Sequence, residues 1–187
     1  MATASPSKLL TAEEYFRMPR PDVPTELVRG EVVELKWHGF RHGTVCVRIG
    51  KVLDSFCEAR DLGQVVGTGV ITERGPDTVR GADVAYYSYS RLPKDQEPEG
   101  YPDVAPDLVF EVLSPSNRWP QVLAKVEEYL KAGVSVAVVV DPKANKLQIY
   151  RGEDADEPVA VLNASDTFEL PDILPGFSMT VGKLIRR

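Results

Sequence analysis

Two acidic residues lie inside short apolar stretches of the sequence. Glu111 has apolar neighbours on both sides in the stretch 108–113, and Asp83 lies in the similar stretch 82–87. Burying a carboxylate without a partner is costly, so an acid in such a strand usually has one. A divalent cation suits this role, and two acids with a lysine are the minimum set for metal-assisted cleavage of a phosphodiester bond.

Strand periodicity places Glu111 on a face that begins with a second acid. Successive strand residues point to opposite faces, so Asp107 and Glu111 share one face, and the apolar positions 108, 110 and 112 share the other. A structural ion pair with an arginine or lysine is the alternative role for Glu111. For Asp83, the alternative is an acid that caps a turn at the end of a strand.

Further candidate residues lie near these acids, each with a simpler explanation. Lys125, on the helix predicted after the Glu111 strand, can point toward its acidic end, or it can be a solvated lysine paired with Glu128. Glu26, at the start of a hairpin, is either a further acid of the site or an exposed strand charge. His38 and His42 are four positions apart but have no HExxH motif, which argues against a zinc protease.

Composition indicates one globular domain spanning residues 1–187. The net charge of −6 argues against non-specific coating of nucleic acid, but the 22 basic residues still allow a local basic rim around a nuclease site. No apolar run reaches the length of a membrane span, and the N-terminus does not have the pattern of a secretory signal. Cys46 and Cys57 are interpreted as small buried residues in a reducing cytoplasm, so we expect a cytoplasmic protein with no membrane partner.

Apolar periodicity and capping signals predict a mixed sheet flanked by helices, an α/β fold bordering on α+β. Thr11 and Glu14 fit a capping box at the start of a short N-terminal helix. The predicted elements are a helix ending at 17, a hairpin at 26–37, helices at 42–56 and 121–132, strands at 63–72, 79–87, 108–113, 134–140, 147–151 and 159–162, and a short closing segment at 175–184.

Several longer motifs carry a resemblance to a known family. They are LTAEEYFRMP at 10–19, ELVRGEVVEL at 26–35, His42-Gly43, ADVAYYS at 82–88, PDLVFEVLSPS at 106–116, KVEEYLKAGV at 125–134 and VVVDP at 138–142. On these motifs the chain resembles the Uma2 family (DUF820), bacterial proteins similar to PD-(D/E)XK restriction-type nucleases. The resemblance is strongest over residues 10–151. It implies a restriction endonuclease-like core, a central mixed β-sheet flanked by α-helices, with an N-terminal helix and β-hairpin.

The resemblance also implies a set of site residues. Asp83 matches the acid of the PD motif, Glu111 matches the acid of the (D/E)XK element, and Glu26 matches an acid near the N-terminus that can complete the site. Leu113 stands at the position of the (D/E)XK lysine, and Lys125 on the following helix is the expected substitute.

One departure concerns the same helix. Gln121 stands where many relatives carry an acid, one turn before the lysine.

Taken together, these residues predict an endonuclease that uses Mg²⁺ or Mn²⁺ to hydrolyse phosphodiester bonds of DNA. Asp83 and Glu111 are the expected metal ligands, and Lys125 is expected to assist the attacking water. RNA is a further substrate that the same site would serve. The alternative is a catalytically inactive module that keeps the nuclease fold and binds DNA or protein, which the acidic composition and the missing strand lysine favour. Analogy with nucleases of this type also suggests a homodimer.

Overall fold

A computed structural model describes residues 9–152 and 156–186 of the chain. The helices are α1 (Ala12–Arg17), α2 (Phe40–Glu58), α3 (Trp119–Lys131) and α4 (Val181–Ile185). The strands are β1 (Thr25–Val28), β2 (Glu31–Glu34), β3 (Gly63–Glu73), β4 (Thr78–Ser88), β5 (Leu108–Val112), β6 (Val136–Asp141), β7 (Lys146–Tyr150), β8 (Ala160–Leu162), β9 (Thr167–Phe168) and β10 (Met179–Thr180).

Eight of these strands form one mixed sheet in the order β2-β1-β4-β5-β6-β7-β8, with β3 paired to β4. Strands β5 and β6 run parallel and are joined through α3, as a parallel pair needs a crossover connection. The other pairs in this sheet are antiparallel. The predicted α/β class, a central mixed sheet flanked by helices, is therefore confirmed.

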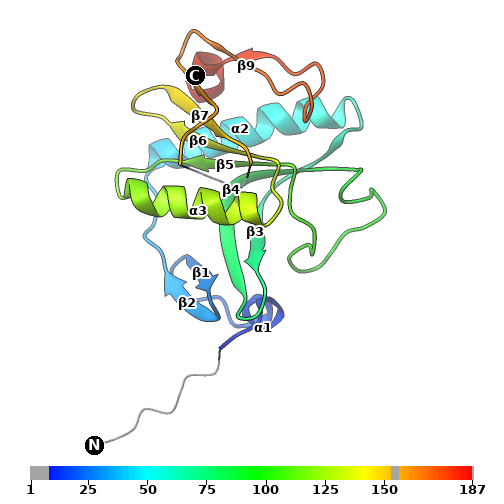
Figure 1. The fold of residues 1–187 in the computed structure, drawn as a ribbon, viewed down its shortest axis with the longest axis vertical. Coiled ribbons are helices and arrows are strands. Elements are labelled where there is room, and N and C mark those ends of the chain that lie inside the picture. The colour runs from blue at the N-terminus through cyan, green and yellow to red at the C-terminus, as the bar shows by residue number, and fades with distance from the viewer. Residues whose placement is uncertain (1–8, 153–155, 187) are drawn as a thin grey trace, which may run out of the picture.

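Helices α2 and α3 lie on opposite sides of the sheet (Figure 1). The side chains of β5 alternate between them as predicted. Leu108, Phe110 and Val112 pack in the cluster that contains α2, whereas Val109 packs in the cluster that contains α3. The C-terminal segment, with Phe168 and α4, covers the α2 side of the sheet. Burial on both faces explains why β5 reads as an almost continuous apolar run.

A smaller third cluster lies where α1 and the β1–β2 hairpin meet the lower end of β3 and β4 (Figure 1). The capping box is confirmed, because Thr11 Oγ1 accepts from the Glu14 backbone and the Glu14 side chain accepts from the Thr11 backbone. The buried Asp77 fastens α1 to the sheet by accepting a 2.7 Å hydrogen bond from the Ala12 backbone. Burial raises the pKa of Asp77, but this acceptor role and the contact with Arg74 outweigh it and lower the pKa overall.

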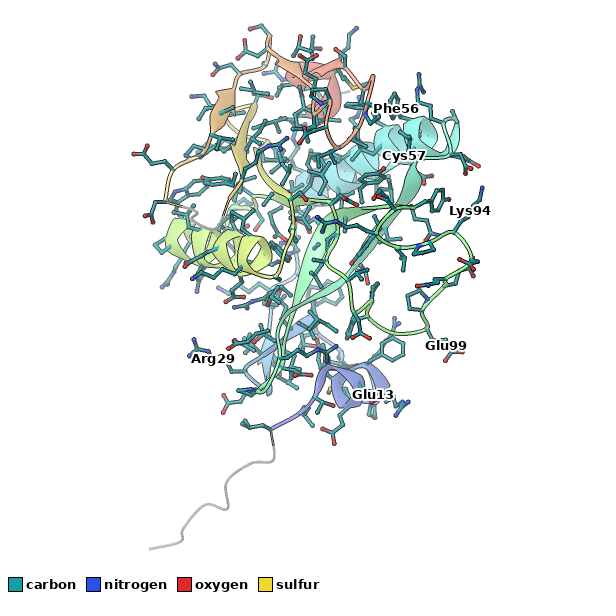
Figure 2. The ribbon with its side chains drawn as sticks, turned by 45° about the vertical axis from the view of Figure 1, so that its right-hand side comes forward. Glu13, Arg29, Phe56, Cys57, Lys94 and Glu99 are labelled. Atoms are coloured by element: carbon teal, nitrogen blue, oxygen red, sulfur yellow. The ribbon has the colours of Figure 1, made fainter. Side chains whose placement is uncertain are left out.

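Most element boundaries differ from the prediction by only a few residues. Helix α3 begins at Trp119 and takes Pro120 into its first turn, where proline is tolerated because that N–H has no helical acceptor. The short strand pair β9–β10 was not predicted, because a two-residue strand leaves no periodic signal. Both cysteines are free, with Cys57 buried on α2 next to Phe56 (Figure 2). No described helix has the length and apolar character to cross a membrane.

Strand β4 contains a bulge near its middle. Val66 pairs with Ala85 and Thr68 pairs with Ala82, so two steps along β3 correspond to three steps along β4. The extra residue falls within 83–84. A bulge bends its strand and re-aims a side chain, and bulges often occur beside active sites.

On its other edge, β4 changes partner at the same place. Residues 84–86 pair with β5, whereas Val79 pairs with Leu27 of β1. Within the described pairing, residues 80–83 have neither strand as a partner on this edge. We call this region, residues 80–83 of β4 with the facing ends of β5 and β1, the fork. Backbone groups at the fork need partners from side chains or solvent.

Leu53 on α2 provides a test of the packing on this side of the sheet. It is fully buried in the α2 cluster, whereas Val47 on the same helix is 72% exposed. We expect Leu53→Ala to lower the free energy of unfolding by about 3 kcal/mol, because the truncation leaves a cavity in the core. The matched variant Val47→Ala should change it by less than about 0.5 kcal/mol. Urea unfolding of both proteins measures the difference, and equal midpoints would contradict the described core.

Candidate functional site

Side chains of the candidate site satisfy the free backbone groups at the fork. The Gly81 N–H donates to Glu26 Oε1 at 2.9 Å, and the Gly81 carbonyl accepts from Lys125 Nζ at 2.6 Å. The Val112 N–H donates to Asp83 Oδ2 at 2.7 Å. The same ionisable groups that suit phosphodiester chemistry thus replace the missing ladder between β4 and its two neighbours.

Lys125 lies at the centre of this arrangement. Its Nζ is 3.0 Å from Glu111 Oε2 and 3.0 Å from Glu26 Oε1, and the side chain is only 18% exposed. Burial would lower the pKa of Lys125, but the charges of Glu111 and Glu26 raise it well above the ordinary value. The lysine therefore stays protonated. The alternative of a solvated lysine paired with Glu128 is wrong.

Glu111 accepts from two side chains of α3. Tyr129 donates its hydroxyl to Oε1 at 2.8 Å, and Lys125 donates to Oε2 at 3.0 Å. Burial and the negative charge of Asp83 raise the pKa of Glu111 to about 7, although Lys125 and Tyr129 oppose this rise. Glu111 does pair with a lysine, as in the alternative of a structural ion pair. This pair belongs to a larger cluster of charges and is not isolated.

Glu26 is buried, with 4% of its surface exposed, so the alternative of an exposed strand charge is wrong. Besides Lys125 and the Gly81 amide, it accepts from Arg80 at 2.9 Å. Arg80 in turn makes two hydrogen bonds to Glu128 on α3, at 2.5 and 2.8 Å. Burial would raise the pKa of Glu26, but Lys125, Arg80 and Gly81 together lower it. Glu26 is therefore ionised and ties the hairpin to β4 and α3.

Asp83 faces helix α2 as well as β5. His42 Nε2 lies 3.2 Å from Asp83 Oδ2, and His42 is buried with 7% of its surface exposed. Burial would raise the pKa of Asp83, but the hydrogen bond and charge of His42 and the Val112 amide lower it overall. Asp83 lies in the middle of β4, at the bulge, so the alternative of a turn-capping acid is wrong.

A cleft of about 640 Å³ opens over these residues. Its lining includes Glu26, Asp83, Glu111 and Lys125, together with side chains from the hairpin, the 116–118 segment and the first turns of α3. Gln121, the departure from the family pattern, also lines it. The acids predicted from distant parts of the sequence therefore reach one solvent-accessible cavity.

The charges of the cluster suit a divalent cation. Four carboxylates, those of Glu26, Asp83, Glu111 and Glu128, meet two cationic side chains, Lys125 and Arg80. With all four carboxylates ionised, the acids of the cluster outnumber Lys125 and Arg80 by two. Among the contacts of the described residues, Asp83 Oδ1 has no hydrogen-bond donor, and the oxygens of Glu111 each retain a lone pair. Hard oxygen donors with excess negative charge are what Mg²⁺ and Mn²⁺ bind.

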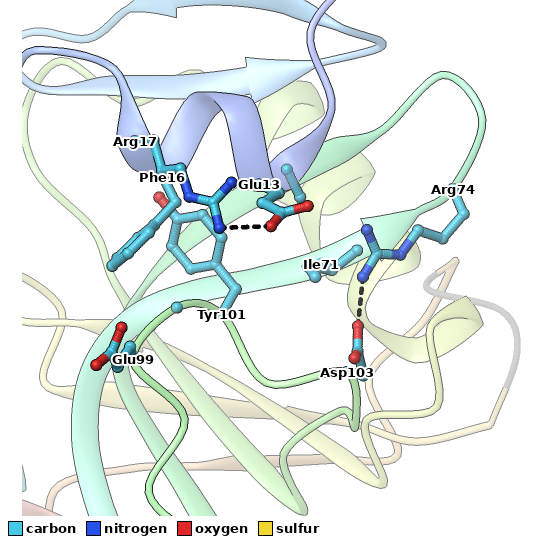
Figure 3. A pocket seen from close by; sticks show the side chains of 10 residues that line it. Glu13, Phe16, Arg17, Ile71, Arg74, Glu99, Tyr101 and Asp103 are labelled. Atoms are coloured by element: carbon cyan, nitrogen blue, oxygen red, sulfur yellow. Dashed lines mark hydrogen bonds and ion pairs between the residues drawn. The ribbon is translucent and has the colours of Figure 1, made fainter.

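A second pocket, of about 370 Å³, lies between α1 and residues 99–103 (Figure 3). Four of its charged side chains pair with one another: Arg17 with Glu13 at 2.7 Å, and Arg74 with Asp103 at 2.5 Å. Phe16 meets Tyr101 edge to face across it. These paired charges and aromatic contacts indicate a packing seam that holds α1 in place.

The sequence interpretation missed some residues of the site. His42 was assigned no role at the site, although the His42-Gly43 motif singled it out. Arg80 and Tyr129 had no distinguishing signal, because their roles depend on which strands and helices meet. Asp107 lies at the opposite end of β5, where it accepts from the Ser88 backbone at 2.7 Å and pairs with Arg91 at 2.9 Å, so it is not part of this cluster.

Comparisons with known proteins agree with this architecture. A solved structure described as "a putative nuclease belonging to DUF820 from Anabaena variabilis" matches with a TM-score of 0.77 and 18% sequence identity, over 94% of this chain and 97% of that one. At this identity the likeness establishes the fold, a mixed α/β sheet with flanking helices. No curated protein matches the chain.

The sequence also matches a family model directly. The Uma2 model, described as "Putative restriction endonuclease", matches residues 12–182. The chain belongs to the Uma2 family. The family match extends past residue 151, the end of the region in which the resemblance was strongest. It includes the C-terminal strands β8 to β10.

Glu26 gives a test of the buried charge network. Replacing Glu26 by Gln removes a negative charge while Lys125 and Arg80 remain, and breaking a buried pair in this way costs about 3 kcal/mol. We expect the free energy of unfolding to fall by that amount in urea titrations. Glu31→Gln on the neighbouring exposed strand is the matched control and should change it little. Equal stability of the two variants would mean that Glu26 does not support the cluster.

Proposed function

We propose that this protein is a metal-dependent endonuclease that hydrolyses phosphodiester bonds of DNA. The observation that carries the proposal is the convergence of Asp83, Glu111 and Lys125 on one cleft, although they come from β4, β5 and α3. Membership of the Uma2 family, whose model is described as "Putative restriction endonuclease", supports the same reaction class.

In this proposal, Asp83 and Glu111 hold a Mg²⁺ or Mn²⁺ ion through their carboxylate oxygens. Such an ion supplies Lewis-acid polarisation of a phosphate oxygen and activation of a water molecule. Lys125, which stays protonated, orients the attacking water or offsets negative charge that develops on the phosphate. Glu26 completes the site by holding Lys125 together with Glu111.

The rim of the cleft fits a polyanionic substrate. Lys36, from the segment after the hairpin, and Arg118, before α3, are both exposed and line the cleft beside the acids. Cationic side chains at such positions meet phosphates of a nucleic-acid backbone and contribute to affinity without regard to sequence. These local basic residues make binding of a nucleic acid at the cleft compatible with the net charge of −6.

One observation favours the alternative, a binding module without catalysis. An ammonium group has three donors, and Lys125 has three acceptors within 3.0 Å: Glu111, Glu26 and the Gly81 carbonyl. The lysine is thus satisfied by the protein alone. Catalysis requires Lys125 to release one of these contacts. We expect it to be the contact with Glu111, because a carboxylate that also binds a metal ion is a weaker hydrogen-bond acceptor.

The activity test is nicking of supercoiled plasmid by the purified protein in Mn²⁺. We expect Asp83→Asn and Lys125→Gln each to reduce the rate by about 100-fold or more, because each removes a preorganised charge from the reacting centre. Lys131→Gln on the same helix, where Lys131 is exposed and lies outside the cleft, is the matched control and should retain the rate.

Nicking at equal rates by the wild type and Asp83→Asn would reveal a contaminant and refute the assignment. Single-stranded RNA assayed in parallel tests the substrate, and preferential cleavage of RNA would contradict the DNA specificity proposed here.

Metal binding by itself separates the enzyme from the binding module. A ligand that binds only the folded state at 100 times its Kd adds about 2.7 kcal/mol of stability. We expect saturating Mn²⁺ to raise the melting temperature of the wild type, and to raise that of Asp83→Asn much less. Failure of Mn²⁺ to shift the wild type, together with no nicking, would favour the binding module.

A further inference from the structure

Two histidines stand beside Asp83, and the proposed function gives neither of them a role. Ligand atoms of His38, His42 and Asp83 all lie within 4.8 Å of one another. The two imidazole rings are stacked, with centroids 4.0 Å apart and planes inclined by 14°. Imidazole nitrogens and a carboxylate oxygen this close together are potential ligands of a single metal ion.

The two histidines come from adjacent parts of the chain but differ in burial. His42 is buried in the first turn of α2, and its second nitrogen, Nδ1, lies 3.5 Å from Cys46 Sγ one turn further on. Metal-bound histidines usually have such a partner for the other ring nitrogen, which fixes the ring. His38 is exposed on the segment before α2 and lines the same cleft as Asp83 and Glu111.

We propose that His38 and His42 join Asp83 in a nitrogen-containing metal site, which favours a first-row transition-metal ion such as Co²⁺, Zn²⁺ or Fe²⁺ over Mg²⁺. The inference deepens the proposed function and rests on it for Asp83 as a metal ligand. Mg²⁺ takes oxygen ligands almost exclusively, whereas two imidazoles and a carboxylate are a common donor set for the later transition metals.

The dimensions of the cluster agree with this assignment. Bonds of about 2.1 Å hold the ligand atoms around such an ion roughly 3 Å apart. His42 Nε2 and Asp83 Oδ2 are already 3.2 Å apart, and both side chains are mostly buried. The ligand atom of His38 lies within 4.8 Å of these two, and His38 belongs to the exposed stretch between Trp37 and Phe40. The site is thus preformed at two ligands and completed by a third that can adjust.

The composition of the chain makes the inference directly testable, because His38 and His42 are its only two histidines. In untagged protein loaded with Co²⁺, every imidazole bound to the ion must come from this cluster. Proton NMR of the Co²⁺ complex displays the ring N–H protons of bound histidines far outside the normal spectral range. We expect two such signals in the wild type and one in His38→Gln.

Calorimetric titration gives an independent readout that does not use cleavage. We expect His38→Gln to weaken Co²⁺ binding by about tenfold or more, as loss of a ligand does, and to change Mg²⁺ binding by less than about twofold. Because His38 is exposed, its replacement should leave the fold intact, which circular dichroism verifies. The control is Glu34→Gln, which removes a carboxylate from the cleft lining outside the cluster and should leave the Co²⁺ affinity within about twofold.

The outcomes separate this inference from the proposed function. Co²⁺ binding that Asp83→Asn abolishes, but with no shifted imidazole signals and no effect of His38→Gln, would overturn the histidine site and leave the acidic site standing. Two shifted signals in a protein that does not nick DNA in any of these ions would support the histidine site and overturn the nuclease. Absence of Co²⁺ binding would overturn the inference.

Discussion

The arrangement of the whole site depends on how one strand satisfies its backbone hydrogen bonds. Strand β4 pairs with β5 over one part of its length and with β1 over another, and the fork between them leaves peptide groups without strand partners. Glu26, Asp83 and Lys125 supply those partners. Their positions are therefore fixed by the same requirement that holds the sheet together, and this requirement is strong because unpaired buried peptide groups are costly. Preorganisation of the charges follows from the sheet topology and needs no separate device.

The charges at the fork stabilise one another only as a group. Lys125 and Arg80 each contact two carboxylates, and Glu26 contacts both cations. Taking any of these groups from water alone would cost more than a single pair returns. The carboxylates at the fork outnumber these two cations, and this imbalance accompanies the pKa of Glu111, which burial and the charge of Asp83 raise. A bound cation would relieve that imbalance, which is how the electrostatics of the folded chain and the proposed chemistry are connected.

Much of this architecture could be predicted from the sequence, because it depends on local signals. Residue types and spacing predicted the capping box, the hairpin, both long helices and the alternation along β5. The acids at 83 and 111 were recognised because a charge within an apolar strand is unusual. Strand register is what the sequence could not supply. The bulge of β4 re-aims Asp83 toward His42, and the contacts of Arg80 join β4 to both β1 and α3, so neither role has a local signature. The alternative pairing of Lys125 with Glu128 is wrong for the same reason, since tertiary partners take the place of a helix neighbour.

The small cluster around Leu27, Val79 and Ala12 limits the local stability of one wall of the cleft. Apart from the contacts of Glu26 and of the hairpin turn, the hairpin that carries Glu26 has one registered strand pair with β4, and its outer strand β2 is exposed along its whole length. Units with few buried contacts open locally at a lower free energy than the rest of a protein. One wall of the cleft therefore belongs to the part of the sheet that should exchange its amide hydrogens first, while Asp83 and Glu111 belong to the part that should exchange last. A long substrate would thus meet a fixed acidic floor beneath a wall that can move to admit it.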